Sequence, residues 1–444
     1  MTSTRLRAST RAWAVVTLVC ALVTSSAVGA SAEAASSPDW AFDLYDVQSV
    51  QDQGWTGEGV KVAVIGSQIN PDLPVFAGQN LTLAEGALCA DGGPVASTEA
   101  TASITHDTTV VAYINGNGTG NGSIRGIAPG ADVTFYGNGP ASDAGCYSAG
   151  PEDVTTFGWG VQRAVDDGAR IVITSRSSAD WDGDAEAVAN AVAKGVVVVV
   201  ATPNPSSTSD SGYPHGYNGV VAASGVDREG MLQTRDDGQP QAIADTTVVA
   251  AGDSLAVIGS STGGWDAPTT GTGSSFAAPI VAGMLAVVAQ RYPDASGNQL
   301  IQTLIHNTGR EDHALARDES GGYGYGAAWL THMLQVDPAQ YPDENPLMTK
   351  STGVPSVEQV DAAAARGFTL PEAVETAAPP PAPAEGANDS PDIGAASASP
   401  MSTLVPVVLT IAAIVVGLIV IGVIILVIFM TNARKKRKLQ GGPA

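Results

Sequence analysis

Residues 271–285 read Gly-Thr-Gly-Ser-Ser-Phe-Ala-Ala-Pro-Ile-Val-Ala-Gly-Met-Leu, so that glycines and small residues run directly into an apolar helix. Pro279 is tolerated in such a helix if it falls in the first turn, where its missing N–H has no partner to lose. Ser275 is then expected at the helix N-terminus. There, unsatisfied N–H groups and the helix dipole favour an alkoxide nucleophile and a developing oxyanion. An ordinary serine N-cap explains the same pattern, and local physics alone favours that interpretation.

Outward from this segment, apolar runs alternate with helical patterns. The expected elements are a strand over 60–65, a helix over 153–168 followed by a strand at 171–173, and a helix over 184–194 followed by a strand at 196–200. Gly195 ends the second helix. All-apolar strands that alternate with helices are typical of a parallel sheet covered on both faces, so we predict an α/β domain.

The segment at 273–279 also closely resembles the nucleophile motif of the subtilisin-like serine proteases, Gly-Thr-Ser-x-Ala-x-Pro. Further segments similar to family landmarks are Thr56–Ile65, Gly126–Ala131, Tyr213-Pro214, Val220–Asp227 and Gly322–Gly326. The resemblance covers residues 39–346. It implies a three-layer, subtilisin-like fold with a mainly parallel, seven-stranded sheet, and it implies that Ser275 is the nucleophile.

The same resemblance implies roles for two more residues. His106 begins His-Asp-Thr-Thr-Val-Val-Ala, which is similar to the family's His-Gly-Thr-x-Val-Ala, and would be the general base. Asn204 ends Val-Ala-Thr-Pro-Asn, where the family has the asparagine of its oxyanion hole. The plainer alternatives are a surface or core histidine, and a turn asparagine between Pro203 and Pro205.

The first strand departs from the family at the catalytic acid. The family reads Val-Ile-Asp-Ser/Thr-Gly, whereas this chain reads Val-Ile-Gly-Ser-Gln at 64–68, so Gly66 stands where the aspartate belongs. That acid fixes the histidine tautomer and stabilises the imidazolium. In the subtilisin whose triad has been dissected, losing the acid alone lowers turnover roughly 3 × 10⁴-fold, and activity stays roughly 10³- to 10⁴-fold above that of water. Neither Asp72 nor Asp107 is expected to reach the ring nitrogen that faces away from Ser275.

Other departures cluster around the same site. Asp107 replaces the glycine after the histidine, Pro203 replaces the glycine before Asn204, and Ser175-Arg176-Ser177 stands where the family has its Ser-Leu-Gly substrate strand. These residues crowd backbone that should pair with a peptide. Together they argue against ordinary peptide hydrolysis.

Composition and motifs limit the classes of ligand that we expect this protein to bind. A net charge of −23 repels phosphates, so nucleic acid is not expected as a partner. Asp180, Asp182 and Asp184 alternate like the start of a calcium loop, but the glycine and glutamate that should follow are absent, so we interpret the segment as an acidic turn without metal. The glycine-rich stretch at 116–122 lacks the lysine of a phosphate-binding loop and is expected to be a surface loop. No cofactor is expected.

The two ends of the chain carry targeting patterns. Residues 1–34 have the order of a secretory signal peptide, with arginines, a short apolar run and small residues. Residues 347–402 are expected to form a Pro/Ala-rich stalk, residues 403–431 a transmembrane helix, and residues 432–444 a basic tail. The positive-inside rule places that tail in the cytoplasm and the main domain outside.

Two cysteines remain after signal-peptide removal. Cys89 and Cys146 would face an oxidising compartment, where they form a disulfide or stay as two buried free thiols. One disulfide is the expected arrangement.

This order of segments resembles that of the mycosins, membrane-anchored subtilases that act with actinobacterial type VII secretion systems. We therefore weigh three hypotheses. The first is an impaired or inactive peptidase homologue that binds a peptide or protein, or serves as a structural component of a secretion system. The second is a slow serine endopeptidase that uses Ser275, His106 and Asn204. The third is a display module that binds no peptide.

Overall fold

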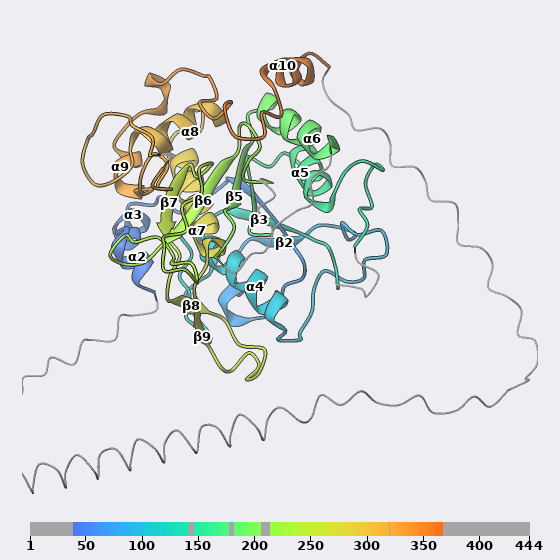
Figure 1. The fold of residues 1–444 in the computed structure, drawn as a ribbon. Helices are drawn as coiled ribbons and strands as arrows, with labels where there is room; N and C mark the ends of the chain where they lie inside the picture. Colours follow the sequence, from blue (N-terminus) through green and yellow to red (C-terminus); the bar gives the residue numbers. More distant parts are fainter. Residues whose placement is uncertain (1–38, 141–145, 177–181, 206–213, 319, 367–444) are drawn as a thin grey trace, which may run out of the picture. The chain divides into compact units, whose positions relative to one another are not determined.

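The computed structural model describes residues 39–140, 146–176, 182–205, 214–318 and 320–366 (Figure 1). The chain divides into two units, Met1–Glu375 and Thr376–Ala444, and every described residue belongs to the first. The predicted signal peptide, transmembrane helix and basic tail lie outside the described residues, as does most of the predicted stalk.

The centre of the domain is a seven-stranded parallel sheet in the order β2-β3-β1-β4-β5-β6-β7. Its strands are β1 (Lys61–Gly66), β2 (Leu81–Leu83), β3 (Asp132–Gly137), β4 (Ile171–Thr174), β5 (Val197–Ala201), β6 (Val221–Val226) and β7 (Val248–Ala251). A separate antiparallel pair joins β8 (Leu255–Val257) to β9 (Thr269–Gly271). The predicted α/β fold with a mainly parallel sheet is confirmed.

The strands bury both of their faces, as their near-continuous apolar sequence predicts. In β1, Val62 and Val64 belong to one core cluster, whereas Ala63 and Ile65 belong to the other. Successive side chains of a strand point to opposite faces, so a single strand supplies both cores. The result is a three-layer domain with the sheet in the middle.

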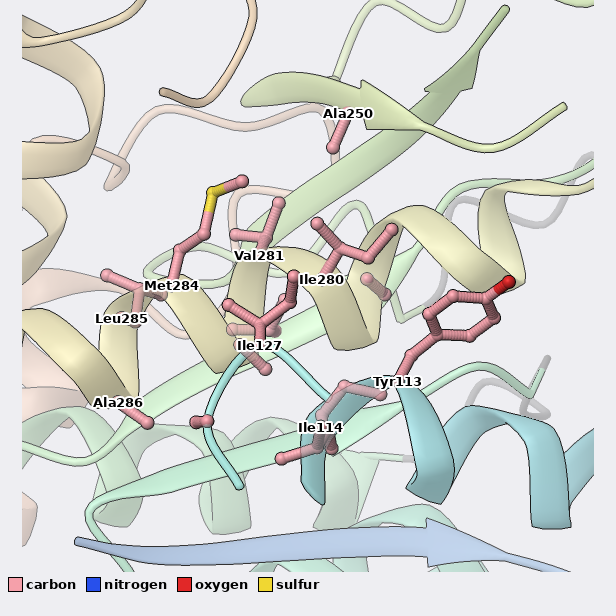
Figure 2. Packing of buried hydrophobic residues seen from close by; sticks show 14 of the residues in the cluster. Tyr113, Ile114, Ile127, Ala250, Ile280, Val281, Met284, Leu285 and Ala286 are labelled. Carbon is pink, nitrogen blue, oxygen red and sulfur yellow. The ribbon is translucent and has the colours of Figure 1, made fainter. Parts of the chain in front are cut away.

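The larger core lies between the sheet and the helices α4 (Ala102–Asn115) and α7 (Ser274–Arg291). Figure 2 shows Tyr113 and Ile114 of α4 close to Ile127, with Ile280 and Val281 of α7 beside them. Residues of α2 (Trp40–Leu44), α3 (Val47–Asp52), α8 (Gly297–His306), α9 (Leu330–Leu334) and the 3₁₀ turn η2 (Pro74–Phe76) also belong to this core, and the 3₁₀ turn η3 (Pro338–Gln340) contacts α8. Contacts between α4 and α7 fix the relative position of the two helices that carry His106 and Ser275.

The opposite face of the sheet is covered by α5 (Thr156–Asp166) and α6 (Asp182–Ala193), which pack on each other. Asp184 is buried in α6 and accepts hydrogen bonds from the N–H and the hydroxyl of Thr155, the N-cap of α5. Gly195 follows α6 with φ of 71°, a conformation that suits glycine at a helix end. Both helices and the strands after them agree with the sequence predictions.

The helix α7 is long and apolar enough to cross a membrane, but 89% of its length is buried inside the domain. It is the one such helix in the part of the chain that the structure describes. We therefore assign α7 as the central core helix. The predicted membrane span at 403–431 lies outside that part.

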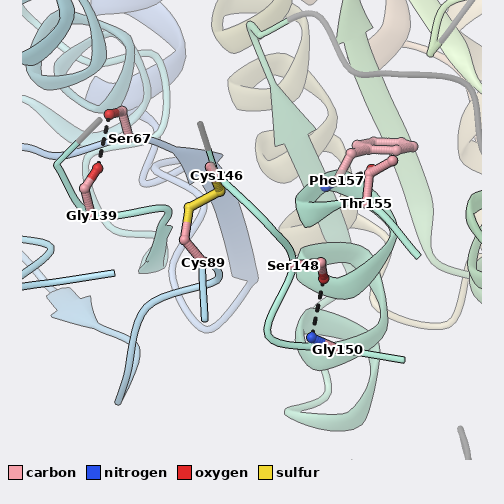
Figure 3. Close-up of a disulfide and its surroundings, with 8 residues drawn as sticks. All are labelled: Ser67, Cys89, Gly139, Cys146, Ser148, Gly150, Thr155 and Phe157. Carbon is pink, nitrogen blue, oxygen red and sulfur yellow. Dashed lines mark hydrogen bonds between the residues drawn. A yellow bond between two sulfur atoms is a disulfide. The ribbon is translucent and has the colours of Figure 1, made fainter. Parts of the chain in front are cut away.

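A disulfide joins Cys89 to Cys146, whose Cα atoms are 5.4 Å apart, and it links the segment after β2 to the segment after β3 (Figure 3). An isolated antiparallel bridge between Cys89 and Ser148 extends the connection. The expected pairing is confirmed.

The folded domain continues past residue 346, where the sequence analysis placed the start of the stalk. Leu347 and Lys350 are buried, and α10 (Val357–Arg366) contacts α6. This boundary was wrong because α10 is polar on average and buries Ala363 alone among its residues, so it lacks the apolar content that identifies a core helix.

Candidate active site

The candidate site lies at the carboxyl ends of β1, β4 and β5. From β1 the chain passes to β2 and β3 on one side, and it continues through β4 and β5 on the other. Ligands of open α/β sheets bind at such a switch point, in the crevice beyond the carboxyl ends of the strands. Gly66 ends β1, Arg176 follows β4 and Asn204 follows β5, so the sheet brings three predicted site positions to one edge.

Ser275 lies in the first turn of α7, as predicted, and is 8% exposed. The preceding Ser274 N–H donates to Asn204 Oδ1 over 2.9 Å. Among the described residues, the Ser275 N–H has no hydrogen-bond acceptor. It is therefore available to stabilise a negative oxygen at the helix N-terminus.

Pro279 lies in the second turn of α7, not in the first as expected. A proline there cannot donate to the carbonyl four residues earlier, which belongs to Ser275. The Ser175 hydroxyl donates to this carbonyl instead, over 2.8 Å. The proline thus leaves an acceptor through which Ser175, the residue that follows β4, is hydrogen-bonded to the nucleophile residue.

The Asn204 side chain is oriented by its contacts. Its Oδ1 atom accepts from the Ser274 N–H over 2.9 Å and from Gln233 Nε2 over 3.4 Å. Because Oδ1 is used in this way, the amide NH₂ group faces elsewhere, and it makes no hydrogen bond among the described residues. It can donate to a developing oxyanion together with the Ser275 N–H.

His106 lies in the second turn of α4, which begins at Ala102 and is capped by Thr101. Its side chain is 26% exposed, and its ring centroid is 6.2 Å from that of Phe276. The Nδ1 atom lies 2.7 Å from Asp107 Oδ1. Among the described residues, no hydrogen bond joins His106 to Ser275; in an unliganded site this bond is often long.

The Asp107 contact corrects the expectation that no carboxylate reaches the far ring nitrogen. The Asp107 side chain is only 4% exposed, and its Oδ2 accepts from the Ser67 N–H over 2.6 Å. Arg176 donates from Nε to Oδ1 over 3.0 Å and from Nη2 to Oδ2 over 2.7 Å. Asp72, the other carboxylate considered, is exposed and has no contact with His106 in the described structure.

These contacts determine the charge of Asp107. Burial alone would raise the pKa of its carboxyl, but the hydrogen bond from His106 and the charge of Arg176 outweigh burial and hold the pKa below the usual 3.8. Asp107 is therefore ionised at neutral pH. An ionised carboxylate at Nδ1 is the group that fixes a histidine tautomer and stabilises an imidazolium.

Arg176, expected to crowd the substrate strand, directs its guanidinium to α4. Besides Asp107, it donates to the carbonyl and the hydroxyl oxygen of Ser103 over 3.1 Å and 2.6 Å. Its side chain remains 35% exposed. Ser177, the last residue of the predicted substrate strand, lies outside the described residues.

The described residues hold no group of three or more metal-ligating side chains. Of the proposed acidic turn, Asp180 lies outside the described residues, and Asp184 is the buried partner of Thr155.

Comparison with known proteins identifies the family of the chain. The model of the subtilase family matches residues 57–326. Fervidolysin of Fervidobacterium pennivorans is 28% identical over 310 residues, which cover 66% of this chain and 43% of fervidolysin. The thermostable alkaline protease of Halalkalibacterium halodurans is 24% identical over 271 residues, covering 60% of this chain and 66% of that protein. The chain thus spans less than two thirds of either relative.

Two solved structures share the fold. The crystal structure of fervidolysin, a keratinolytic enzyme related to subtilisin, superposes with a TM-score of 0.52 at 25% identity, covering 67% of this chain and 45% of that one. The crystal structure of MycP1 from the ESX-1 type VII secretion system superposes with a TM-score of 0.51 at 20% identity, covering 69% and 88%. Because the family model spans more than half of the sequence and the sheet has the same architecture, this chain belongs to the subtilase family.

Proposed function

We propose that this protein is a slow serine endopeptidase, anchored in the membrane with its peptidase domain outside the cytoplasm. The observation that carries the proposal is the contact of 2.7 Å between His106 Nδ1 and Asp107 Oδ1, because it supplies the carboxylate that the sequence lacks at Gly66. A buried nucleophile, an oriented histidine and an oxyanion site then occupy one edge of the sheet.

The reaction follows from these positions. The Ser275 hydroxyl attacks the peptide carbonyl carbon while His106 Nε2 takes the hydroxyl proton. The Asn204 amide and the Ser275 N–H donate to the carbonyl oxygen as it becomes negative. His106 then gives the proton to the departing amine, and water cleaves the acyl-enzyme by the same steps in reverse.

Two features support a slow reaction. The guanidinium of Arg176 contacts both oxygens of Asp107, so the carboxylate shares its negative charge with a cation before any imidazolium forms. In addition, His106 must move or rotate to bond Ser275, since these residues are not hydrogen-bonded to each other in the described structure.

The cellular location rests on sequence patterns. The signal peptide at 1–34 and the apolar run at 403–431, followed by a basic tail, support export and a single C-terminal anchor. An acidic exported domain with a disulfide suits an oxidising compartment.

A second function is a binding or structural component that cleaves nothing, with a peptide or protein as its ligand. The pairing of Arg176 with Asp107 favours it, because the same contacts that slow the reaction also stabilise an inactive arrangement. The fold shared with MycP1 makes a type VII secretion assembly a candidate partner under this proposal.

A fluorophosphonate probe separates the two functions. We expect the full-length chain to be labelled covalently, with labelling lost in Ser275→Ala. The matched control is Ser261→Ala, an exposed serine between β8 and β9, which should label like the wild type. A folded wild-type chain that takes up no probe would contradict the peptidase proposal and support the binding component.

A further inference from the structure

The end of β1 has room for only one side chain. A Cβ atom on Gly66 would lie 2.9 Å from Asp107 Oδ2 and 2.8 Å from a ring carbon of Phe135. Cβ atoms essentially never approach other atoms that closely, so any residue larger than glycine at position 66 requires both of these neighbours to shift. Gly66 is therefore the residue that leaves space for the Asp107 carboxylate.

The carboxylate is also bonded at this strand end. Its Oδ2 accepts from the N–H of Ser67, the residue that directly follows Gly66, and its Oδ1 faces His106 Nδ1. The carboxylate of residue 107 thus occupies the place into which a side chain on residue 66 would project, although it comes from α4.

From this geometry we propose that Asp107 is the positioning carboxylate of the site, that the acid has moved from the strand end to the helix, and that Gly66 is its obligatory companion. The inference rests on the proposed peptidase function and specifies how that function survives the loss of the strand acid. The glycine at 66 and the aspartate at 107, two separate departures from the family motif, are one exchange.

Asp107 acts through His106 and does not touch the substrate. Oδ2 accepts from Ser67 and from Arg176 Nη2, while Oδ1, which also accepts from Arg176 Nε, accepts the Nδ1 proton and thereby leaves Nε2 as the nitrogen that can take the Ser275 proton. The serine proton moves to Nε2 and later to the leaving amine, while the Nδ1 proton stays in place. No proton is transferred to Asp107.

The first test measures the tautomer of His106. The full-length chain is labelled with ¹⁵N at its 5 histidines, and the His106 signals are assigned by their loss in His106→Gln. At about pH 9, well above the ordinary histidine pKa, we expect the proton on Nδ1 in the wild type. In Asp107→Asn, the oxygen should stay with Ser67 and the NH₂ group should face Nδ1, moving the proton to Nε2. Asp72→Asn, an exposed carboxylate, is the matched control and should change nothing.

The second test exchanges the two residues and follows the rate of fluorophosphonate labelling. All variants carry Phe135→Leu to give a side chain at position 66 more room. We expect Gly66→Asp and Asp107→Gly each to label more slowly than this parent, and the double variant to label faster than either. Gly66→Asp alone labelling faster than the parent would overturn the proposal, because it would mean that the site lacked an acid.

The two tests distinguish failure of the proposed peptidase function from failure of the assignment of Asp107. If the wild type takes up no probe, the proposed peptidase function fails, but the tautomer measurement still decides the role of Asp107. If the wild type is labelled and Asp107→Asn leaves the Nδ1 proton in place, the peptidase function stands and the assignment of Asp107 is wrong.

Discussion

A side chain at position 66 and the carboxylate of Asp107 exclude each other, since a Cβ atom on Gly66 would lie 2.9 Å from Asp107 Oδ2. Sequence alone shows a missing acid, whereas the structure shows a carboxylate in the space where that acid would project. Stability, pH dependence and reactivity should all respond to this arrangement.

Replacing Arg176 should change stability and reactivity in opposite directions. Arg176→Met leaves a buried carboxylate with fewer donors, so the free energy of unfolding should fall by roughly 1–3 kcal/mol. The labelling rate of Ser275 should rise about tenfold, because the full negative charge of Asp107 then faces the forming imidazolium; this corresponds to ~1.4 kcal/mol. Arg176→Lys keeps the charge and should stay slow. Equal rates in the Met and Lys variants would contradict this account.

Arg176→Met should also change how the free energy of unfolding depends on pH in the acid range. The folded-state pKa of Asp107 is depressed, so its contribution to stability is present above the unfolded pKa of about 3.9 and is lost as pH falls through the lower folded value. Without Arg176 the folded-state pKa of Asp107 rises. The difference in unfolding free energy between wild type and Arg176→Met should therefore become smaller as pH falls through this acid range. Urea unfolding at a series of acid pH values measures it; parallel curves for wild type and Arg176→Met would show that Arg176 does not depress this pKa.

Ser175 and Pro279 should be coupled through the Ser275 carbonyl. Ser175→Ala removes its donor and should cost about 1–2 kcal/mol of unfolding free energy. In a Pro279→Ala background the helix supplies its own N–H to that carbonyl, so the cost should shrink and the coupling energy should be about 1 kcal/mol. A double-mutant cycle by urea unfolding measures it, and strictly additive effects would rule out the shared acceptor.

Lys350 should make stability rise with alkaline pH. Burial lowers its pKa from 10.5 to about 7, while its Nζ donates to the carbonyls of His215 and Asp245. Between these pH values the unfolded chain binds the proton that the folded chain releases, so unfolding free energy increases from about pH 7 toward pH 10. Subtracting the pH profile of Lys350→Met isolates this contribution. A difference that stays flat over this range would show that Lys350 is charged when buried.

The disulfide should stabilise the domain by constraining the unfolded chain. Its two cysteines are separated by 57 residues, so removing the bond should lower the unfolding free energy by roughly 2–4 kcal/mol. The double variant Cys89→Ser/Cys146→Ser should have the unfolding free energy of reduced wild type, and added reductant should not change it. Unfolding of the wild type that is equally insensitive to reductant would contradict this role.

Much of the fold could be predicted because its signals are local. The apolar run in β5, the helical periodicity of α5 and the glycine that ends α6 each lie within a few neighbouring residues. The position of α10 and the burial of Lys350 depend on distant partners such as α6 and Asp245, so periodicity does not reveal them.

The residues of the site likewise include some that local sequence predicts and some whose role depends on distant parts of the chain. The sequence motif predicted Ser275 at the start of an apolar helix, and the structure places it there, but the role of Asp107 depends on two distant segments. At the end of β1, Gly66 leaves the space and Ser67 donates the backbone N–H, and Arg176 donates from the segment that follows β4. The departures at 66, 107 and 176 occur together in the sequence, and that co-occurrence is the signal from which the exchange could have been inferred.

The most direct test of the central claim is the rate at which a fluorophosphonate labels Ser275 in Asp107→Asn compared with the wild type. If Asp107 holds His106 in its reactive tautomer, the rate should fall by a factor on the order of 10⁴, as happens when the triad acid of a serine protease becomes asparagine. An unchanged rate would show that Asp107 is not the acid of this site.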